Sequence, residues 1–144
     1  MDDESGTRAK MQAATLEIDG KVYKLELAKI EGTMFGWEDH GILTAMLTLD
    51  YLAGSFQGAG GYCLDESTGA PDYERRGTAY GLDHVMQIMR VVGVREWEKV
   101  KGQRVYALKA GGFGTFVDGL ANVDRPESLF VLFKAHAAAW GVGK

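Results

Sequence analysis

The sequence predicts an α+β fold, in which an antiparallel β-sheet of about five or six strands carries two α-helices packed on one side. Apolar and polar residues alternate through much of the first half of the chain, as half-buried strands require. The connections between these segments have hairpin length, which only antiparallel neighbours allow. Apolar residues at helical spacing come later in the chain, and they predict helices that cover the sheet.

Length and composition predict a single domain of ordinary globular character. The chain has 144 residues, of which 46% are hydrophobic and 25% charged, and its net charge is -4. We expect residues 1–12 to form a flexible N-terminal tail and residues 13–144 to form a single α+β domain. The acidic balance disfavours nucleic acid as a partner, because phosphate contacts need a basic patch. No apolar run reaches the ~20 residues of a membrane helix, so no membrane partner is expected.

The first predicted unit is a β-hairpin over residues 16–27. Asp19-Gly20 lies between two alternating segments and suits the positive backbone angles of a two-residue type I′ turn. This turn pairs Ile18 with Lys21. The resulting register places five apolar residues on one face, namely Leu16, Ile18, Tyr23, Leu25 and Leu27.

Two further strands are predicted before the first helix. Residues 42–51 alternate, with Leu43, Ala45, Leu47, Leu49 and Tyr51 on one face. A short fourth strand over 61–64 is expected to pair back along 47–51 across a glycine-rich turn. Residues 64–77 are polar and contain Pro71, which predicts a loop.

A helix is predicted from Thr78, which serves as its N-cap, to about Val92, and Gly93 ends it. Its apolar stripe is expected to comprise Leu82, Val85, Met86, Met89 and Val92. A short turn over 97–100 should follow, and then strands over 104–109 and 115–122. A second helix is predicted from the capping sequence that begins at Asp124 to about Trp140, with apolar residues on two of its sides.

A polar triplet, Glu38-Asp39-His40, precedes the third strand. Two carboxylates beside an imidazole suit a metal or acid–base chemistry, but adjacent side chains point in different directions and no distant ligands accompany them. We therefore interpret the triplet as a solvated turn or as polar contacts to a ligand, and we expect no metal.

The segment from Gln57 to Asp65 is dense in glycine. Backbone amides of such a segment can surround an anion, although no phosphate-loop or dinucleotide motif is present. The alternative is a glycine-rich hairpin turn with a bulge. If a ligand binds here, its contacts are expected from Gln57, Gly58, Gly60, Gly61, Tyr62 and Asp65.

Arg75 and Arg76 follow in the polar segment and could hold a phosphate, or they could remain solvated. Cys63 is the single cysteine, and we expect it to be a buried small residue rather than a nucleophile. His84 and His136 are expected to be helix-face or core-edge residues, each with an ordinary hydrogen bond. No catalytic set and no cofactor motif emerges, so we predict a protein that is not an enzyme and needs no cofactor.

Several short motifs in this order resemble a family of small uncharacterised bacteriophage and prophage proteins. The resemblance covers residues 26–108 and is carried by Phe35-Gly-Trp-Glu-Asp-His-Gly-Ile-Leu-Thr, Thr48-Leu-Asp-Tyr51, Gln57-Gly-Ala-Gly-Gly-Tyr62, Leu64-Asp65 and Thr78-Ala-Tyr-Gly-Leu82. Phage accessory proteins of this size often antagonise host defence or assist replication, and the resemblance implies a role of this kind.

The predicted function is therefore a phage-type accessory protein that counters host defence by binding a small anionic ligand such as a nucleotide signal. The apolar last helix predicts a homo-oligomer. Two alternatives remain open, a protein-binding inhibitor of a host defence complex and a replication-associated single-strand nucleic-acid binder. A cytoplasmic location is expected, in the host cell if the protein is phage-encoded, since a single cysteine requires no oxidising compartment.

Overall fold

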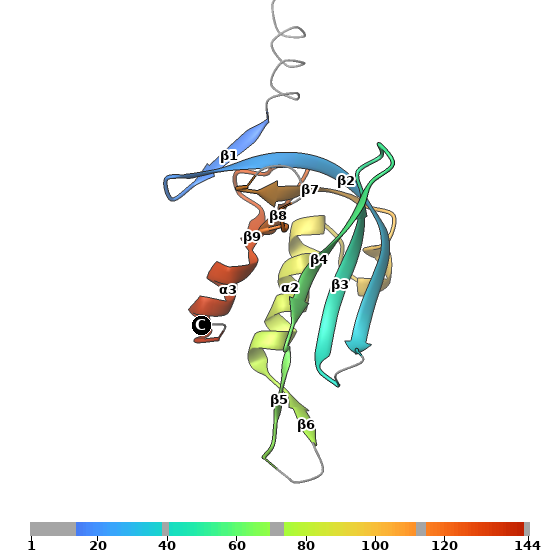
Figure 1. The fold of residues 1–144 in the computed structure, drawn as a ribbon, viewed down its shortest axis with the longest axis vertical. Coiled ribbons are helices and arrows are strands. Elements are labelled where there is room, and N and C mark those ends of the chain that lie inside the picture. Colours follow the sequence, from blue (N-terminus) through green and yellow to red (C-terminus); the bar gives the residue numbers. More distant parts are fainter. Residues whose placement is uncertain (1–13, 39–40, 70–73, 112–114, 143–144) are drawn as a thin grey trace, which may run out of the picture.

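The computed structural model describes residues 14–38, 41–69, 74–111 and 115–142, and it confirms the α+β class. One seven-stranded antiparallel sheet has the order β4-β3-β2-β7-β8-β9, with β1 paired to β2, and a separate small sheet joins β5 to β6 (Figure 1). The elements are β1 (Thr15–Ile18), β2 (Lys21–Trp37), β3 (Leu43–Asp50), β4 (Phe56–Tyr62), β5 (Asp65–Ser67), β6 (Arg75–Gly77), α2 (Ala79–Val92), the short 3-10 helix η1 (Trp97–Lys99), β7 (Arg104–Lys109), β8 (Gly119–Ala121), β9 (Phe130–Leu132) and α3 (Phe133–Ala139).

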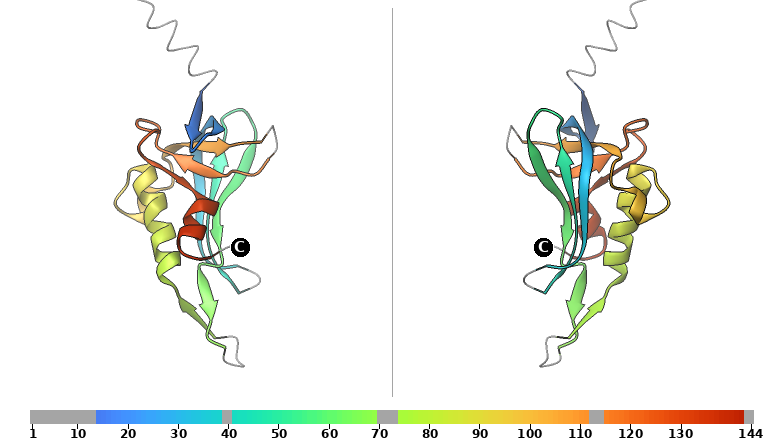
Figure 2. Two further views of the ribbon diagram at one scale, coloured as in Figure 1. Left: turned by 90° about the vertical axis from the view of Figure 1, so that its left-hand side faces the viewer. Right: turned by 90° about the vertical axis from the view of Figure 1, so that its right-hand side faces the viewer.

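The sheet curves around α2, and α3 lies on the same side of it (Figure 2). Apolar side chains of six strands meet those of α2 in one buried cluster. Burial of a large aliphatic side chain contributes roughly 1.5–3 kcal/mol, so this cluster is the main source of stability. Its fully buried members include Ile30, Leu47, Leu49, Ile88, Val105 and Leu120.

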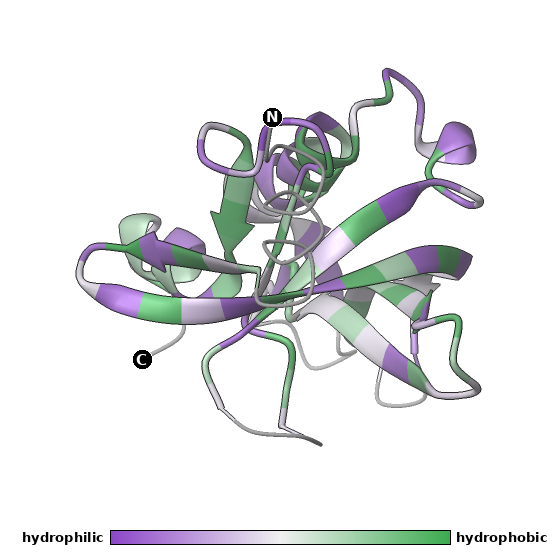
Figure 3. Cartoon of the chain, turned by 90° about the horizontal axis from the view of Figure 1, so that it is seen from above, coloured by the Kyte–Doolittle hydropathy of each residue, from purple (hydrophilic) through white to green (hydrophobic). Residues whose placement is uncertain are grey.

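The first hairpin has the predicted turn and register. Asp19 and Gly20 have φ of 52° and 83°, as a type I′ turn requires. Ile18 lies opposite Lys21, and Leu16 lies opposite Tyr23. Seen from above, hydrophilic and hydrophobic residues alternate along the strands (Figure 3). The hairpin is confirmed.

β2 is much longer than the predicted second arm of that hairpin. It pairs with β7 over residues 24–29 and with β3 over residues 29–37. A β-bulge between Ile30 and Gly32 inserts Glu31, and bulges increase the local bend and twist of a strand. β2 therefore belongs to both halves of the curved sheet, and its last residues extend beyond the end of β7.

The third strand is confirmed, but the fourth is longer than predicted and pairs elsewhere. Gly61 lies opposite Ala45, so residues 61–64 do not run along 47–51 as expected. The turn lies at residues 51–55, where Leu52 has φ of 66° and the Tyr51 N–H donates to the Ser55 carbonyl over 3.0 Å. Leucine rarely adopts this left-handed conformation, so the sequence does not reveal the turn.

The predicted loop over 64–77 contains a second hairpin, formed by β5 and β6. Asp65 pairs with Gly77 and Ser67 with Arg75, and the hairpin projects from the end of the sheet (Figure 1). Cross-strand ion pairs, not apolar alternation, accompany these strands. Periodicity could not detect them for this reason, and the prediction of a loop was wrong there.

α2 begins and ends as predicted. The Thr78 hydroxyl accepts from the Gly81 N–H, and Gly93 closes the helix with φ of 94°. The predicted stripe is only partly right, because Leu82 and Met86 are exposed. The buried face is instead Tyr80, Gly81, His84, Val85, Ile88, Val91 and Val92.

The last helix is much shorter than predicted, and the expected start at Asp124 was wrong. The Asn122 side chain accepts from the N–H groups of Asp124 and Arg125, which makes a turn there. Val131 then pairs with Leu120 in the sheet. An apolar run beside an unfilled sheet edge forms a strand, because strand pairing satisfies its backbone. The long apolar helix expected to form an oligomer is therefore absent.

Replacing Gly81 by alanine tests the contact between α2 and the chain before β5. Alanine normally stabilises a helix interior relative to glycine. Here its Cβ would overlap the carbonyl oxygen of Leu64, so we expect Gly81→Ala to lower the unfolding free energy by about 2 kcal/mol. Urea denaturation measures this. Gly77→Ala is the matched control, since its Cβ meets nothing within 4 Å, and equal stabilities for the two variants would contradict the prediction.

Candidate functional site

Asp65 is the centre of a buried polar cluster at the lower end of the sheet. Its side chain is 2% exposed and accepts four hydrogen bonds. The donors are the Trp37 indole N–H (2.9 Å), the Leu43 backbone N–H (3.0 Å), and Arg75 through Nε (3.1 Å) and Nη2 (2.8 Å). The carboxylate thus joins the end of β2, the start of β3, and β6.

The electrostatics of the cluster follow from these donors. The hydrogen bonds from Arg75 come first among the causes that hold the pKa of the Asp65 carboxyl far below its ordinary value. Contact with the carboxylate raises the pKa of the Arg75 guanidinium in turn. Asp65 is therefore a permanent anion with filled acceptor sites, which suits positioning and not proton transfer.

A cleft of about 570 Å³ adjoins this cluster, between the β5–β6 hairpin and the C-terminal segment. Its volume lies within the range of roughly 300–1,000 Å³ that is usual for small-molecule sites. The lining combines acidic, hydroxyl, thiol and aromatic groups from Cys63, Asp65, Glu66, Gly77, Thr78, Ala79, Tyr80, Trp140 and Val142.

Trp140 forms the C-terminal wall of the cleft and is 45% exposed. Its indole N–H donates to Asp83 over 3.3 Å, and the same carboxylate oxygen lies 2.7 Å from His136 Nε2. The His136 ring lies 5.5 Å from that of Tyr80, which also lines the cleft. Asp83 on α2 and His136 on α3 thereby hold the exposed indole in place.

His84 lies behind this wall and is 1% exposed. Its ring lies 5.6 Å from Phe133 and 6.0 Å from His136, and its Nε2 has no hydrogen-bond partner among the described residues. Burial, and then the neighbouring His136, lower the pKa of His84 to about 4, while Asp83 opposes this shift. His84 thus lies on the buried face of a helix, in line with the prediction, but its Nε2 lacks the hydrogen bond to a described residue that was expected.

The predicted ligand residues fall into groups at opposite ends of β4. Asp65 and Arg75 meet in the cluster, and Arg76 pairs with Glu66 beside the cleft at 2.8 Å. Glu38 follows Trp37, and its backbone N–H donates to Ile42 in a turn (3.2 Å). Two of the predicted residues, Asp39 and His40, lie outside the described part of the chain.

Gln57 lies at the other end of β4 and has a structural role. It accepts from the Tyr51 hydroxyl and donates to the Thr115 carbonyl, both over 2.7 Å. These bonds attach the first residues of β4 to the segment before β8. Gln57 therefore does not reach the cleft.

The glycines of β4 belong to a strand, so the prediction of a glycine-rich loop was wrong. A Cβ at Gly60 would overlap the Ala45 carbonyl, and one at Gly61 would lie 2.5 Å from the His84 ring. A Cβ at Gly58 would lie 3.7 Å from Met46 Sδ, which is an ordinary contact. Close packing against β3 and α2 accounts for Gly60 and Gly61. Tyr62 ends the strand opposite Thr44, at the cleft end.

Cys63 is exposed, against the prediction of a buried residue. Its φ of 61° lies in the left-handed region, which is rare outside glycine and breaks the strand after Tyr62. The break directs Leu64 into the core and leaves the thiol at the cleft.

Metal chemistry receives no support from the described residues, which contain no group of three or more His, Cys, Asp or Glu able to hold an ion. Their helices also lack the length and apolar character of a membrane span.

Sequence reasoning missed Trp37, Asp83 and Trp140 as parts of the site. Trp37 lies 28 positions from Asp65, and Asp83 lies 53 positions from His136. No local pattern links partners so distant. Trp37 directly precedes the predicted Glu38, and this proximity was the one available signal.

Comparisons with known proteins do not assign the chain to a family. No family model, no curated protein and no solved structure matches it. The resemblance to phage proteins therefore stays a prediction.

The buried His84 predicts acid sensitivity. The unfolded chain takes up this proton near pH 6.5 and the folded chain near pH 4, so the unfolded state binds more protons between these values. The contribution of neutral His84 to the unfolding free energy is therefore fully present above pH 6.5. It is lost as the pH drops to 4, which lowers the unfolding free energy by about 3 kcal/mol. Urea denaturation at pH 7 and pH 4 measures the loss of unfolding free energy between these pH values. The loss should be smaller for His84→Gln than for the wild type. Equal losses would contradict the assignment of this acid sensitivity to His84.

The Asp65 cluster predicts unequal effects for two neighbouring acids. In Asp65→Asn, the side-chain NH2 group would face N–H donors and could not accept their hydrogen bonds. We therefore expect Asp65→Asn to lower the unfolding free energy by about 2 kcal/mol or more. Glu66→Gln breaks only the exposed pair with Arg76, and its cost should be below about 1 kcal/mol. Urea denaturation at pH 7 measures the unfolding free energies of both variants. A larger decrease for Glu66→Gln than for Asp65→Asn would refute the structural role of Asp65.

Proposed function

We propose that this chain is a non-enzymatic binding protein whose cleft takes a small ligand with a planar ring and an anionic group, such as a nucleotide. The observation that carries the proposal is the cleft of about 570 Å³ between the Asp65 cluster and Trp140. A ring-sized ligand fits this volume, and the cleft offers an aromatic wall and polar groups together.

The ring of the ligand would stack on Trp140. Its indole is half-exposed at the cleft, yet it is held by Asp83, so little side-chain freedom is lost on binding. Stacking of a base on an aromatic side chain contributes about 1–3 kcal/mol. Tyr80 adds a second aromatic ring to the lining.

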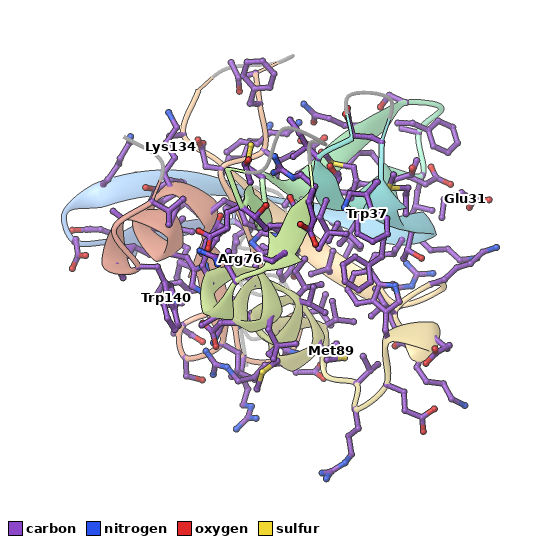
Figure 4. All side chains as sticks on the ribbon, turned by 90° about the horizontal axis from the view of Figure 1, so that it is seen from below. Glu31, Trp37, Arg76, Met89, Lys134 and Trp140 are labelled. Atoms are coloured by element: carbon purple, nitrogen blue, oxygen red, sulfur yellow. The ribbon has the colours of Figure 1, made fainter. Side chains whose placement is uncertain are left out.

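The anionic group would bind to Arg76. The Arg76 side chain (Figure 4) is 65% exposed, and its guanidinium pairs with Glu66, which lines the cleft. An exposed ion pair contributes at most about 1 kcal/mol, so a ligand anion can replace the carboxylate at small cost. Arg75 is different, because Asp65 already occupies it in a two-point contact.

Binding without turnover is the role that suits the buried acid beside the ligand. Asp65 has filled acceptor sites, so it can position groups but is poorly suited to accept a proton. If the resemblance to phage proteins is correct, sequestering a nucleotide signal of the host would need no chemistry.

Isothermal titration with linear and cyclic nucleotides tests the proposal. We expect binding by the wild type, and affinity at least about tenfold lower for Trp140→Leu, because stacking is lost. Trp97→Leu is the control for removal of an indole outside the cleft. Arg76→Gln should weaken phosphate-bearing ligands more than nucleosides, with Arg90→Gln as its control. Failure of every nucleotide to bind, or equal binding by Trp140→Leu, would refute the proposal.

A further inference from the structure

The second half of β2 has a neighbour on one side only. β7 pairs with β2 as far as Lys29, and the Ile30 N–H donates to the Gln103 carbonyl at 2.8 Å. From Gly32 to Trp37, β2 pairs with β3, and no described strand lies on its other edge. This half of β2 lies at the front of the molecule in the right-hand view of Figure 2.

The pattern of hydrogen bonds shows which groups this edge presents. In an antiparallel strand, the N–H and C=O of one residue point to the same neighbour and those of the next residue point away. The Glu38 N–H donates to the Ile42 carbonyl, toward β3. Alternation then directs the backbone groups of Trp37, Phe35 and Thr33 to the open edge, where no described residue bonds to them.

The edge lacks the usual protection against strand addition. Natural edge strands carry lysine, proline or a bulge that prevents pairing with another chain. Residues 32–37 read Gly-Thr-Met-Phe-Gly-Trp, without charge or proline, and the bulge lies before them at Glu31. The segment is a regular template for another strand.

Apolar side chains surround the same edge. Phe35 and Trp37 are 50% and 64% exposed, although they lie opposite Ala45 and Leu43 on the core side of the sheet. Phe35 contacts Trp97 at 5.8 Å. On α2, Leu82 and Met86 are exposed two turns and one turn before Met89, respectively. Met89 (Figure 4) and Trp97 are both partly buried against the core cluster. An added strand would extend the sheet over this stripe.

We propose that a second copy of the chain occupies this position, with the two β2 edges paired antiparallel about a two-fold axis. Such a contact is self-complementary, since each edge offers the same outward donors and acceptors. The axis keeps both α2 helices on one side of the joined sheet. Phe35 and Trp37 of each copy then lie toward Leu82 and Met86 of the other.

The area needed for a stable dimer supports this arrangement. A specific interface buries about 1,200–2,000 Å², which a few paired backbone residues cannot supply. The exposed aromatic and aliphatic side chains beside the edge would add buried apolar area to the interface, and each copy contributes its own set. Their exposure in the single chain is explained by their burial in the dimer.

Light scattering after size-exclusion chromatography tests the proposal with the full chain. The wild type should have twice the chain mass of 15.7 kDa. Thr33→Pro should be monomeric, because it removes one outward N–H and leaves the bonds to β3 intact. Thr33→Val, which keeps that N–H, should remain a dimer. A monomeric wild type, or a dimeric and folded Thr33→Pro, would overturn the proposal.

A second variant guards against misfolding of the proline variant. Leu82→Arg places a charge on the exposed stripe of α2 and should also give a folded monomer that unfolds cooperatively on heating, at a temperature no higher than that of the wild-type dimer. Gln87→Arg is the control, since it lies about 140° around the helix from Leu82 and should stay dimeric. Hydrogen exchange should show amides 33, 35 and 37 protected in the dimer and exposed in Leu82→Arg. Protection of α3 alone, or capture of a strand from another protein by a monomeric chain, would refute self-pairing.

Discussion

The lower half of the molecule depends on one buried carboxylate. Asp65 brings the end of β2, the start of β3 and β6 to a single point, and no apolar contact there could do this with the same directionality. A buried charge is costly unless donors surround it, and four donors do so. The position of the hairpin of β5 and β6 and the orientation of Trp37 follow from this arrangement.

Local signals in the sequence were sufficient to predict the structure of those short segments whose conformation depends on nearby residues alone. Asp19-Gly20 determines the first turn, and Thr78 with Gly93 determines both ends of α2. These residues act through bonds within a few positions, so a single sequence reveals them. The antiparallel α+β class followed from the same short connections.

Features that depend on contacts between distant parts of the chain could not be predicted from the sequence. β9 exists because the edge of β8 accepts it, whereas the same apolar run in isolation favours a helix. Gly60 and Gly61 of β4 leave no room for a side chain because of Ala45 and His84, which lie far away in the chain. Among the predicted ligand residues, Asp65 and Arg75 did meet, but only the folded chain adds Trp37 and separates Gln57 from the cleft.

The bulge at Glu31 changes which alternate residues of β2 face the core, from even-numbered before it to odd-numbered after it. Before it, even-numbered residues such as Ala28 and Ile30 face the core; after it, Phe35 and Trp37 lie on that side. Losing one residue here would reverse every later side chain between the two faces of the sheet. Insertions and deletions in related chains should therefore be excluded from residues 31–37 or occur in pairs, while the turn at 51–55 can vary freely in length.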